Sequence, residues 1–213
     1  MTESKERVFV IDDDPSVRKG LARLLASAGY ESEVFSSAAE FLAREPYPGP
    51  ACVVVDVQMP ELSGLQFQEA LIKRRREEQL VFITGHGDIP MCAQVMKAGA
   101  VDFLPKPFRP KELLDCVKRA MTRSAEQRRT AAGKNEARGR LDLLTPREFE
   151  VMQLVATGLL NKQVGAELGM AEKTVKVHRG RVMQKLGINS VAELVRFVEK
   201  AGAAPFSKRA TKV

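Results

Sequence analysis

Four short apolar runs in the first half of the chain each end at a polar side chain. The runs at residues 8–11, 52–55, 80–83 and 101–105 are followed respectively by Asp12 and Asp13, by Asp56, by Thr84 and by Lys106. Apolar runs of this length, bounded by turn residues, predict buried strands. Parallel strands bring their carboxyl ends to one edge of a sheet, where ligands bind. We therefore expect these polar side chains to converge at such an edge.

Amphipathic helical patterns separate these runs. Apolar residues recur at intervals of three and four between Val17 and Ala28, which predicts a helix that starts at Pro15 and closes at Gly29. Further helices are predicted at residues 38–43, 64–78, 91–98 and from 110, with a weaker strand at 32–35. Strands that alternate with helices predict a parallel sheet covered on both faces. Residues 1–120 are thus expected to form an α/β domain, doubly wound around five parallel strands.

The second half of the chain shows no such alternation. Residues 121–140 are mainly polar, and we interpret them as the end of the last helix running into a helical or flexible linker. Gly133 and Gly139 are expected to limit this helix, because glycine disfavours helix interiors.

Four short helices are predicted within residues 141–204, which indicates an all-α bundle. Thr145, Pro146 and Glu148 form a capping box that starts the first helix, and Gly158 ends it. The second helix is expected to be capped by Asn161 and to end at Gly169. The third covers residues 172–186 and ends at Gly187, and Ser190 caps the fourth. The tail at 205–213 is expected to be disordered.

Composition and charge narrow the functional classes. Apolar residues make up 44% of the chain and charged residues 29%, as in ordinary globular proteins. No apolar run approaches the ~20 residues of a membrane span, and the first residues lack the apolar core of a signal peptide, so a cytoplasmic protein with reduced cysteines and no membrane partner is expected. Residues 1–120 carry a net charge of −2 and residues 121–213 of +9, so the second half is expected to meet a polyanion.

The acidic residues at the predicted sheet edge indicate a cation site. Asp12, Asp13 and Asp56 would concentrate negative charge, and oxygen-only ligands select a hard ion such as Mg²⁺. A carboxylate beside a metal ion and the ammonium of Lys106 suits phosphoryl transfer, with the carboxylate as nucleophile. Taken one at a time, the same residues also fit simpler roles: a helix cap at 12–14, a turn at Thr84 and a solvated charge at Lys106.

The motifs resemble two known families. The segments VIDDD at 10–14, VVVDVQMP at 53–60, FITGHGD at 82–88 and FLPKPF at 103–108 resemble the receiver domain of response regulators. The segments TPREFEVM at 145–152, NKQVGAELGM at 161–170 and KTVKVHRGRVMQKLG at 173–187 resemble the LuxR/FixJ-type helix-turn-helix output domain. The order of the two domains is similar to that of the FixJ group of two-component regulators.

The receiver resemblance implies a role for each residue at the sheet edge. Asp56 would accept a phosphoryl group from a sensor histidine kinase, and Thr84 and Lys106 would bind that group. Mg²⁺ or Mn²⁺ would be held by Asp12, Asp13, Asp56 and the main-chain carbonyl of Gln58. Phe103 stands where the family has a switch aromatic, and a cis peptide is expected at Lys106-Pro107. The domain would catalyse only its own phosphotransfer and dephosphorylation, so the protein is not expected to be a separate enzyme.

The third predicted helix of the second half has two distinct sides. On a helical wheel, Val175, His178, Val182 and Leu186 face the other helices, and a basic arc lies opposite, which suits the major groove of DNA. By resemblance, Lys176 and Val177 are candidates for base contacts. Further DNA-contact candidates are Lys162, Lys173, Thr174, Arg179, Gly180, Arg181 and Lys185, most of them as phosphate contacts. Ala171 departs from the family's frequent serine cap, and Gly180 from a longer side chain.

Together these features predict a transcription regulator. Phosphorylation of Asp56 would promote dimerisation, domain release or both, and the homodimer would bind double-stranded promoter DNA and act with RNA polymerase. Two alternatives remain. An aspartyl-phosphate phosphatase would carry a second aspartate where this chain has Gln58. A phosphorylation-driven interaction module would lack salt-sensitive DNA binding.

Overall fold

The computed structural model describes residues 5–59, 62–85 and 89–203. The chain folds into two compact units, residues 1–128 and 129–213. The disorder expected at 205–213, and the last part of the 82–88 motif, lie outside the described residues. None of the described helices is long and apolar enough to cross a lipid bilayer.

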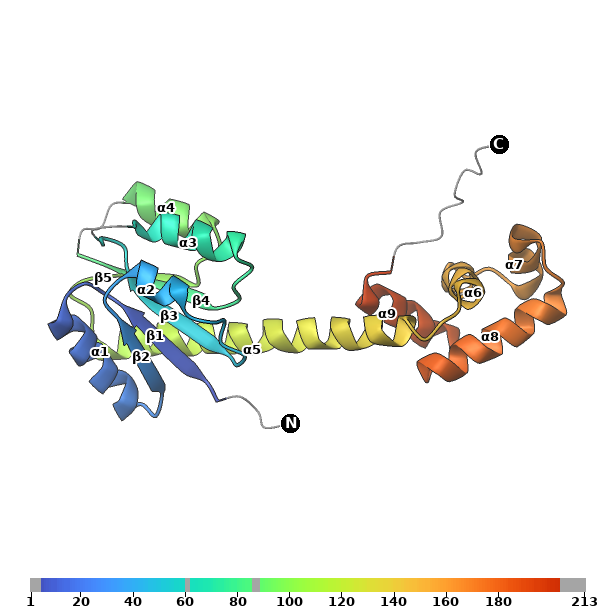
Figure 1. The fold of residues 1–213 in the computed structure, drawn as a ribbon, viewed down its shortest axis with the longest axis horizontal. Coiled ribbons are helices and arrows are strands. Elements are labelled where there is room, and N and C mark those ends of the chain that lie inside the picture. The colour runs from blue at the N-terminus through green and yellow to red at the C-terminus, as the bar shows by residue number, and fades with distance from the viewer. Residues whose placement is uncertain (1–4, 60–61, 86–88, 204–213) are drawn as a thin grey trace. The chain divides into compact units, whose positions relative to one another are not determined.

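Among the described residues of the first unit, five strands form one parallel sheet (Figure 1). They are β1 (Arg7–Ile11), β2 (Glu31–Phe35), β3 (Ala51–Asp56), β4 (Gln79–Thr84) and β5 (Asp102–Pro105). Their spatial order is β2-β1-β3-β4-β5, which is the doubly wound, flavodoxin-like arrangement. The predicted fold class is confirmed.

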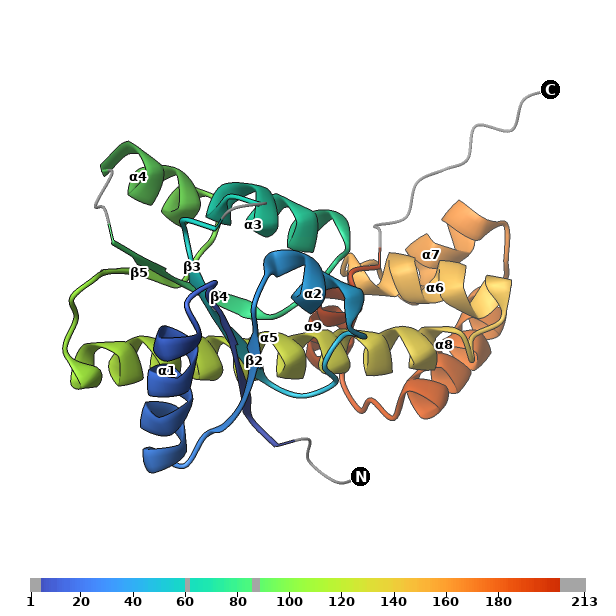
Figure 2. The ribbon, with the colours of Figure 1, turned by 60° about the vertical axis from the view of Figure 1, so that its left-hand side comes forward.

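Helices cover both faces of this sheet. Helices α2 (Ala38–Ala43), α3 (Gly64–Lys73) and α4 (Ile89–Lys97) lie on one face, and α1 (Pro15–Ser27) and α5 (Pro110–Leu141) lie on the other, as Figures 1 and 2 show. Side chains alternate between the two faces of a strand. Phe9 of β1 accordingly packs with α2 and α3, whereas its neighbours in β1 pack with α1 and α5.

Helix α3 ends at Lys73, before the predicted end at residue 78. Arg75 has a φ of 54°, in the left-handed region that breaks a helix. The chain then turns inward, where the guanidinium of Arg76 donates to Glu78 at 2.7 and 3.0 Å and to the main-chain oxygen of Arg44 at 3.1 Å. The buried ion pair of Arg76 with Glu78, and its bond to Arg44 from 32 positions earlier, take the place of the last turn of the predicted helix.

Helix α5 continues to Leu141, although Gly133 and Gly139 were expected to limit it. Contacts on both parts of the helix compensate for the ~1 kcal/mol that each glycine costs relative to alanine. In the first unit, Ser124 Oγ accepts a hydrogen bond from Ala51 N at 3.0 Å. In the second unit, Arg138 Nε donates to the main-chain oxygen of Ala201 at 3.2 Å. The compact first unit, which runs to residue 128, includes the part of α5 that carries Ser124.

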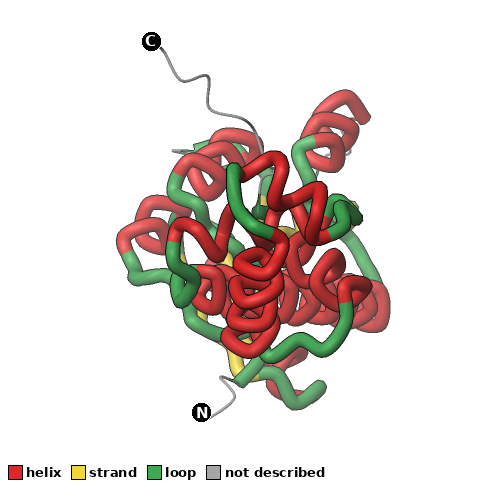
Figure 3. The backbone as a smooth tube through the Cα atoms, turned by 90° about the vertical axis from the view of Figure 1, so that its right-hand side faces the viewer, coloured by secondary structure: helices red, strands yellow, loops and turns green. Residues whose placement is uncertain are grey.

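The second unit is built from helices in its described part, without the strands of the first unit (Figure 3). Beside the end of α5 they are α6 (Pro146–Ala156), α7 (Asn161–Leu168), α8 (Glu172–Leu186) and α9 (Val191–Ala201). Thr145 and Ser190 cap α6 and α9 as predicted, and the capping box with Glu148 is present. Val151, Val164, Val175, Leu186 and Leu194 are among the buried residues that join these helices into one core.

One predicted cap is wrong. Helix α7 is capped at Leu160 rather than Asn161, which is already the first helical residue. The side chain of Gln163 accepts from the N–H of Leu160 at 2.8 Å. The amide oxygen of Asn161 instead accepts from Arg179 Nη1 at 3.1 Å, so it joins α7 to α8.

Candidate metal centre and nucleic-acid interface

Three carboxylates meet at the carboxyl end of the sheet in the first unit. Asp12 and Asp13 follow β1, and Asp56 ends β3. One oxygen of each lies within 4.8 Å of the others. Asp12 and Asp56 are buried, at 1% and 7% exposure, whereas Asp13 is exposed. The predicted convergence of the three carboxylates is thus present.

Lys106 enters this cluster from the end of β5. Its Nζ donates to Oδ2 of Asp56 at 2.6 Å and to Oδ2 of Asp12 at 2.9 Å. Its main-chain N–H donates to the carbonyl of Thr84 at 2.7 Å, which fixes the start of the loop against β4. The peptide between Lys106 and Pro107 is cis, as expected. The ammonium is therefore a structural part of the acidic site rather than a solvated charge.

Backbone groups orient the two buried carboxylates. Oδ1 of Asp12 accepts from the N–H of Asp14, and Oδ1 of Asp56 accepts from the N–H of Gln58, both at 2.9 Å. The cap of helix α1 is Asp14, whose Oδ1 accepts from Ser16 N at 2.7 Å. The simpler role considered for residues 12–14, helix capping, thus falls to Asp14. Asp12 is directed into the cluster.

A residue that the sequence pattern did not single out supports this loop. Arg18, on the first turns of α1, donates through Nη1 to the main-chain oxygen of Asp12 at 2.6 Å. Its position six residues after Asp12 belongs to no periodic pattern that would have signalled it. Arg18 adds positive charge beside the acidic loop.

The electrostatics of the cluster favour a bound cation. Burial raises the pKa of Asp12 above its ordinary value and the charge of Asp56 adds to this, although hydrogen bonds from Lys106 and Asp14 act in the opposite direction. Burial by itself lowers the pKa of Lys106, but its bonds and attraction to Asp56 and Asp12 outweigh this and leave the pKa raised. Oxygen-only donors this close together fit a hard divalent ion such as Mg²⁺.

Two further predicted residues lie on the neighbouring strands. Thr84 is buried at the end of β4, where it pairs with Pro105 of β5. Phe103 of β5 pairs with Phe82 of β4 and packs, partly buried, against the core beneath α2, α3 and α4. Thr84 directly follows Ile83, which pairs with Asp56, whereas Phe103 lies one strand further from Asp56, on β5.

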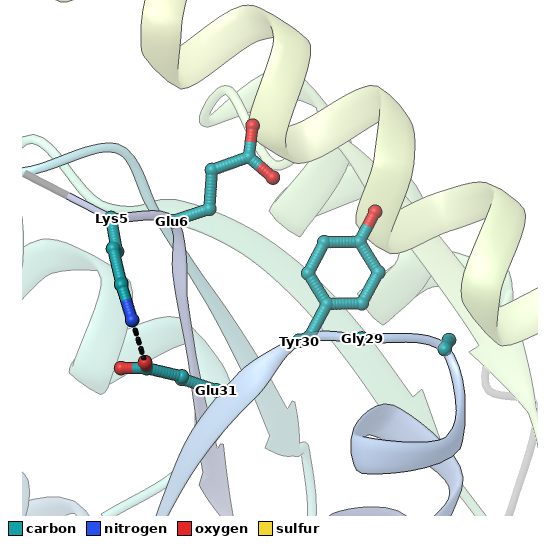
Figure 4. A pocket seen from close by; sticks show the side chains of 6 residues that line it. Lys5, Glu6, Gly29, Tyr30 and Glu31 are labelled. Carbon is teal, nitrogen blue, oxygen red and sulfur yellow. Dashed lines mark hydrogen bonds and ion pairs between the residues drawn. The ribbon is translucent and has the colours of Figure 1, made fainter. Parts of the chain in front are cut away.

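A hollow of about 500 Å³ lies elsewhere, at the amino ends of β1 and β2 (Figure 4). Tyr30 lines it, and Lys5 pairs there with Glu31 at 3.0 Å, both with exposed side chains. Because all the strands run in the same direction, this hollow lies at the opposite edge of the sheet from Asp56, which is at the carboxyl end of β3. Among the described residues, the group of carboxylates that could hold a metal ion is the one at Asp12, Asp13 and Asp56, away from this hollow.

Helix α8 of the second unit has the two sides that its sequence predicts. Val175, Val182 and Leu186 are buried in the core, and His178 is half-buried. Between residues 173 and 184 the exposed positions are Lys173, Thr174, Lys176, Val177, Gly180, Arg181 and Gln184. Lys162 of α7 is also exposed. The exposed side of α8 is therefore cationic and free of acidic side chains between residues 173 and 184, which suits a polyanion.

Two of the predicted contact residues are engaged inside the unit. Lys185 Nζ donates to the carboxylate of Glu148 at 2.7 Å and to the carbonyl of Leu143 at 3.0 Å. Arg179 is half-buried through its bond to Asn161. These bonds hold α8 against α6 and α7, so at least part of the charge on α8 serves the fold of the unit.

Comparisons with known proteins match each of the two units to a family. A family model described as response regulator receiver domain matches residues 8–118, and one described as bacterial regulatory proteins, luxR family, matches residues 142–198. The chain is 46% identical over 210 residues to nodulation protein W of Bradyrhizobium diazoefficiens, covering 99% of this chain and 92% of that protein. It is 41% identical over 198 residues to transcriptional regulatory protein FixJ of Azorhizobium caulinodans, covering 93% and 94%.

A solved structure is similar over nearly the same length. The low-resolution structure of the response regulator StyR is 48% identical, with a TM-score of 0.81, and the match covers 92% of this chain and 99% of that one. The likeness thus includes both the parallel sheet and the helical unit.

Proposed function

The chain belongs to the response regulators that join a receiver domain to a LuxR-family DNA-binding domain, and from this we propose that phosphorylation of Asp56 controls its binding to promoter DNA. The protein is a DNA-binding response regulator of a two-component system. The observation that carries the proposal is the double contact of Lys106 with Asp56 and Asp12. It holds a nucleophilic carboxylate beside a fixed positive charge.

Asp56 is the phosphoryl acceptor in this proposal. One of its carboxylate oxygens attacks the phosphorus atom of a phosphohistidine on a sensor histidine kinase. The phosphorus–nitrogen bond breaks, its electron pair stays with the histidine nitrogen, and an acyl phosphate forms on Asp56. Lys106 lies next to the attacking group and stabilises the charge that develops on the phosphoryl oxygens. Thr84, at the adjacent strand end, would donate to one of them.

Asp12, Asp13, Asp56 and the main-chain carbonyl of Gln58 would hold Mg²⁺ or Mn²⁺. When bound, the ion would offset the negative charge that builds up between the carboxylates and the phosphoryl group. The burial and the raised pKa of Asp12 support this role. A nearby cation favours the charged carboxylate, so it would lower this pKa and offset the cost of burying the charge.

Phosphorylation adds a charge of about −1.5 to −2 at Asp56, and Thr84 and Phe103 would respond to it. Phe103 has no hydroxyl, so its contribution rests on packing against the core. The outcome that we propose is a homodimer, domain release or both, because a two-fold dimer matches a two-fold operator.

The DNA contacts would come from the exposed side of α8 and from the start of α7. They comprise Lys173, Thr174, Lys176, Val177, Gly180 and Arg181, with Lys162 and Arg179 as phosphate contacts. Lys185 is not included, since its ammonium is bound to Glu148. The bound dimer would act with RNA polymerase in the cytoplasm, where the bacterial chromosome lies.

The test is phosphorylation of the full chain with acetyl phosphate and Mg²⁺, for the wild type and Asp56→Asn. Asp14→Asn is the matched control, because asparagine keeps the cap of α1 and Asp14 lies outside the acidic cluster. We expect a monomer-to-dimer shift in sedimentation for the wild type and the control, and none for Asp56→Asn. Dimerisation of Asp56→Asn with acetyl phosphate would contradict the proposal.

DNA binding is then measured by fluorescence anisotropy with duplexes that the phosphorylated wild type selects from a random library. We expect affinity to fall steeply with salt, as counterion release requires. Failure to select or bind any duplex would favour an interaction module without DNA. Sustained hydrolysis of p-nitrophenyl phosphate would favour a phosphatase, which the exposed Gln58 in place of a second aspartate disfavours.

A further inference from the structure

Gly180 lies in the middle of helix α8, on the exposed side of the helix. Glycine in a helix interior weakens folding relative to alanine by roughly a factor of five in the equilibrium constant. A β-carbon added at Gly180 would meet no heavy atom of the described residues within 4 Å. Among the described residues of the second unit, no close contact therefore requires position 180 to lack a side chain.

Close packing explains another helical glycine of this unit. A β-carbon at Gly165 would lie 2.6 Å from the main-chain oxygen of Met170, whereas one at Gly133 would meet the flexible end of the Lys200 side chain, 2.8 Å from its Cε. Gly139 of α5 resembles Gly180, because it is exposed, helical and has no heavy atom of the described residues near its added β-carbon. Gly139 is not on α8, so it serves as a matched reference.

The neighbours of Gly180 on the helix surface are the candidate DNA contacts. On a wheel of about 100° per residue, Lys173, Lys176, Val177 and Gln184 fall within roughly 60° of it, so Gly180 occupies the centre of this side. All four are exposed, and Val177 is an apolar side chain with 48% exposure. The cationic side of α8 thus carries a notch of bare backbone at its centre.

Resting on the proposed function, we propose that the missing side chain of Gly180 lets the backbone of α8 approach the base edges of double-stranded DNA closely. Residues on either side of the notch then reach the bases with shorter side chains. Val177 in particular is apolar, and an apolar side chain that approaches closely contacts the methyl group of thymine. A β-carbon at position 180 would hold the helix away and weaken these contacts together.

The experiment compares full-length wild type, Gly180→Ala and Gly139→Ala. Each is phosphorylated with acetyl phosphate and Mg²⁺ and titrated into a duplex that the wild type has selected from a random library, and into a scrambled duplex of the same length. Thermal unfolding is followed by circular dichroism. We expect both alanine variants to unfold at equal or higher temperature than the wild type, because alanine favours the helix.

The two variants should separate in DNA binding. We expect Gly180→Ala to bind the selected duplex at least tenfold more weakly than the wild type, while Gly139→Ala binds as the wild type does and scrambled-duplex binding changes little for either. A gain in stability with a loss of specific affinity cannot come from a structural role alone. Wild-type affinity in Gly180→Ala would overturn this inference while leaving the proposed function intact. Absence of DNA binding by the wild type itself would overturn both.

Discussion

The Nζ atom of Lys106 lies 2.6 Å from Oδ2 of Asp56, a residue 50 positions earlier in the chain. The same nitrogen lies 2.9 Å from Oδ2 of Asp12. One ammonium thus neutralises part of the charge of two buried carboxylates. A divalent cation bound by these carboxylates shares their oxygens with Lys106, so the two positive charges oppose each other while both assist phosphoryl transfer.

Replacing Lys106 by glutamine should therefore strengthen Mg²⁺ binding and slow the phosphorylation of Asp56. Removing a partly exposed positive charge at this distance should contribute on the order of 1 kcal/mol to metal affinity, or roughly fivefold. Isothermal titration with MgCl₂ measures the affinity, and mass spectrometry after treatment with acetyl phosphate measures the acyl phosphate. Lys97→Gln, which removes an exposed lysine from α4, is the control for net charge. Weaker Mg²⁺ binding by Lys106→Gln would show that Lys106 organises the carboxylates rather than opposing the ion.

Asp12 should make the metal-free protein less stable at neutral pH. Burial raises its pKa above the ordinary value, so the folded state holds the proton more tightly than the unfolded state. The resulting stabilisation is complete below the unfolded pKa and is lost as pH rises through the folded pKa. At pH 7 in EDTA, Asp12→Asn should raise the free energy of unfolding by on the order of 1 kcal/mol, which corresponds to a rise of a few degrees in the melting temperature of the first unit.

Calorimetry with and without MgCl₂ checks this prediction. The gain for Asp12→Asn should shrink as pH is lowered towards 4, and added Mg²⁺ should stabilise the variant less than the wild type. A lower melting temperature for Asp12→Asn in EDTA would mean that the bond to Lys106 outweighs the burial of the charge.

Much of the acidic site follows from the sequence, because its residues obey a local rule. Asp12, Asp56, Thr84 and Lys106 each follow an apolar run, and parallel strands must deliver such residues to one edge. The capping box of Thr145 and Glu148 was equally local, and the structure confirms it. The buried side of α8 follows from its periodicity, so Val175 and Val182 are placed correctly.

The structure differs from the sequence-based predictions where contacts between distant segments determine the local structure. Arg76 lies outside α3, and its guanidinium donates to the main-chain oxygen of Arg44, 32 positions earlier. Helix α5 continues through Gly133 to Leu141, and near its end Arg138 Nε donates to the main-chain oxygen of Ala201, 63 residues further along the chain. Lys185, whose phosphate contact stays a prediction, has an internal partner that the sequence did not indicate, Glu148, 37 residues earlier. No spacing along the chain encodes these partners.

Ser124 should be important for the first unit, although it lies beyond the predicted boundary at residue 120. Its buried Oγ accepts from the buried N–H of Ala51 at 3.0 Å. In Ser124→Ala that N–H loses its partner, so the free energy of unfolding should fall by about 1–3 kcal/mol. Urea unfolding followed by circular dichroism measures the change.

Ser27→Ala is the control for Ser124→Ala. The hydroxyl of Ser27 donates to the carbonyl of Leu24 at the exposed end of α1, so its loss should alter the free energy of unfolding by no more than ~0.5 kcal/mol. Equal effects of the two substitutions would show that α5 does not need its anchor on β3 at this position.

Glu148 should make the second unit sensitive to acid. Its buried carboxylate accepts from Lys185 Nζ at 2.7 Å and from the N–H of Thr145 at 2.9 Å. These bonds, that from Lys185 first, lower the pKa of Glu148 to about 2, from an ordinary 4.5. A lowered pKa gives stability that is complete above the unfolded pKa and is lost as pH falls through the folded pKa, here between pH 4.5 and about 2.

Glu148→Gln should therefore be less stable than the wild type at pH 7, by about 1–3 kcal/mol, because Lys185 loses its charged acceptor. The difference should narrow as pH falls through this window, since the wild type loses the same interaction by protonation. Thermal unfolding at a series of pH values by circular dichroism follows both chains. Glu150→Gln is the matched control, because the pair of Glu150 with Arg147 is exposed on both sides and exposed pairs contribute little. If Glu148→Gln kept the acid sensitivity of the wild type, another carboxylate would be responsible for it.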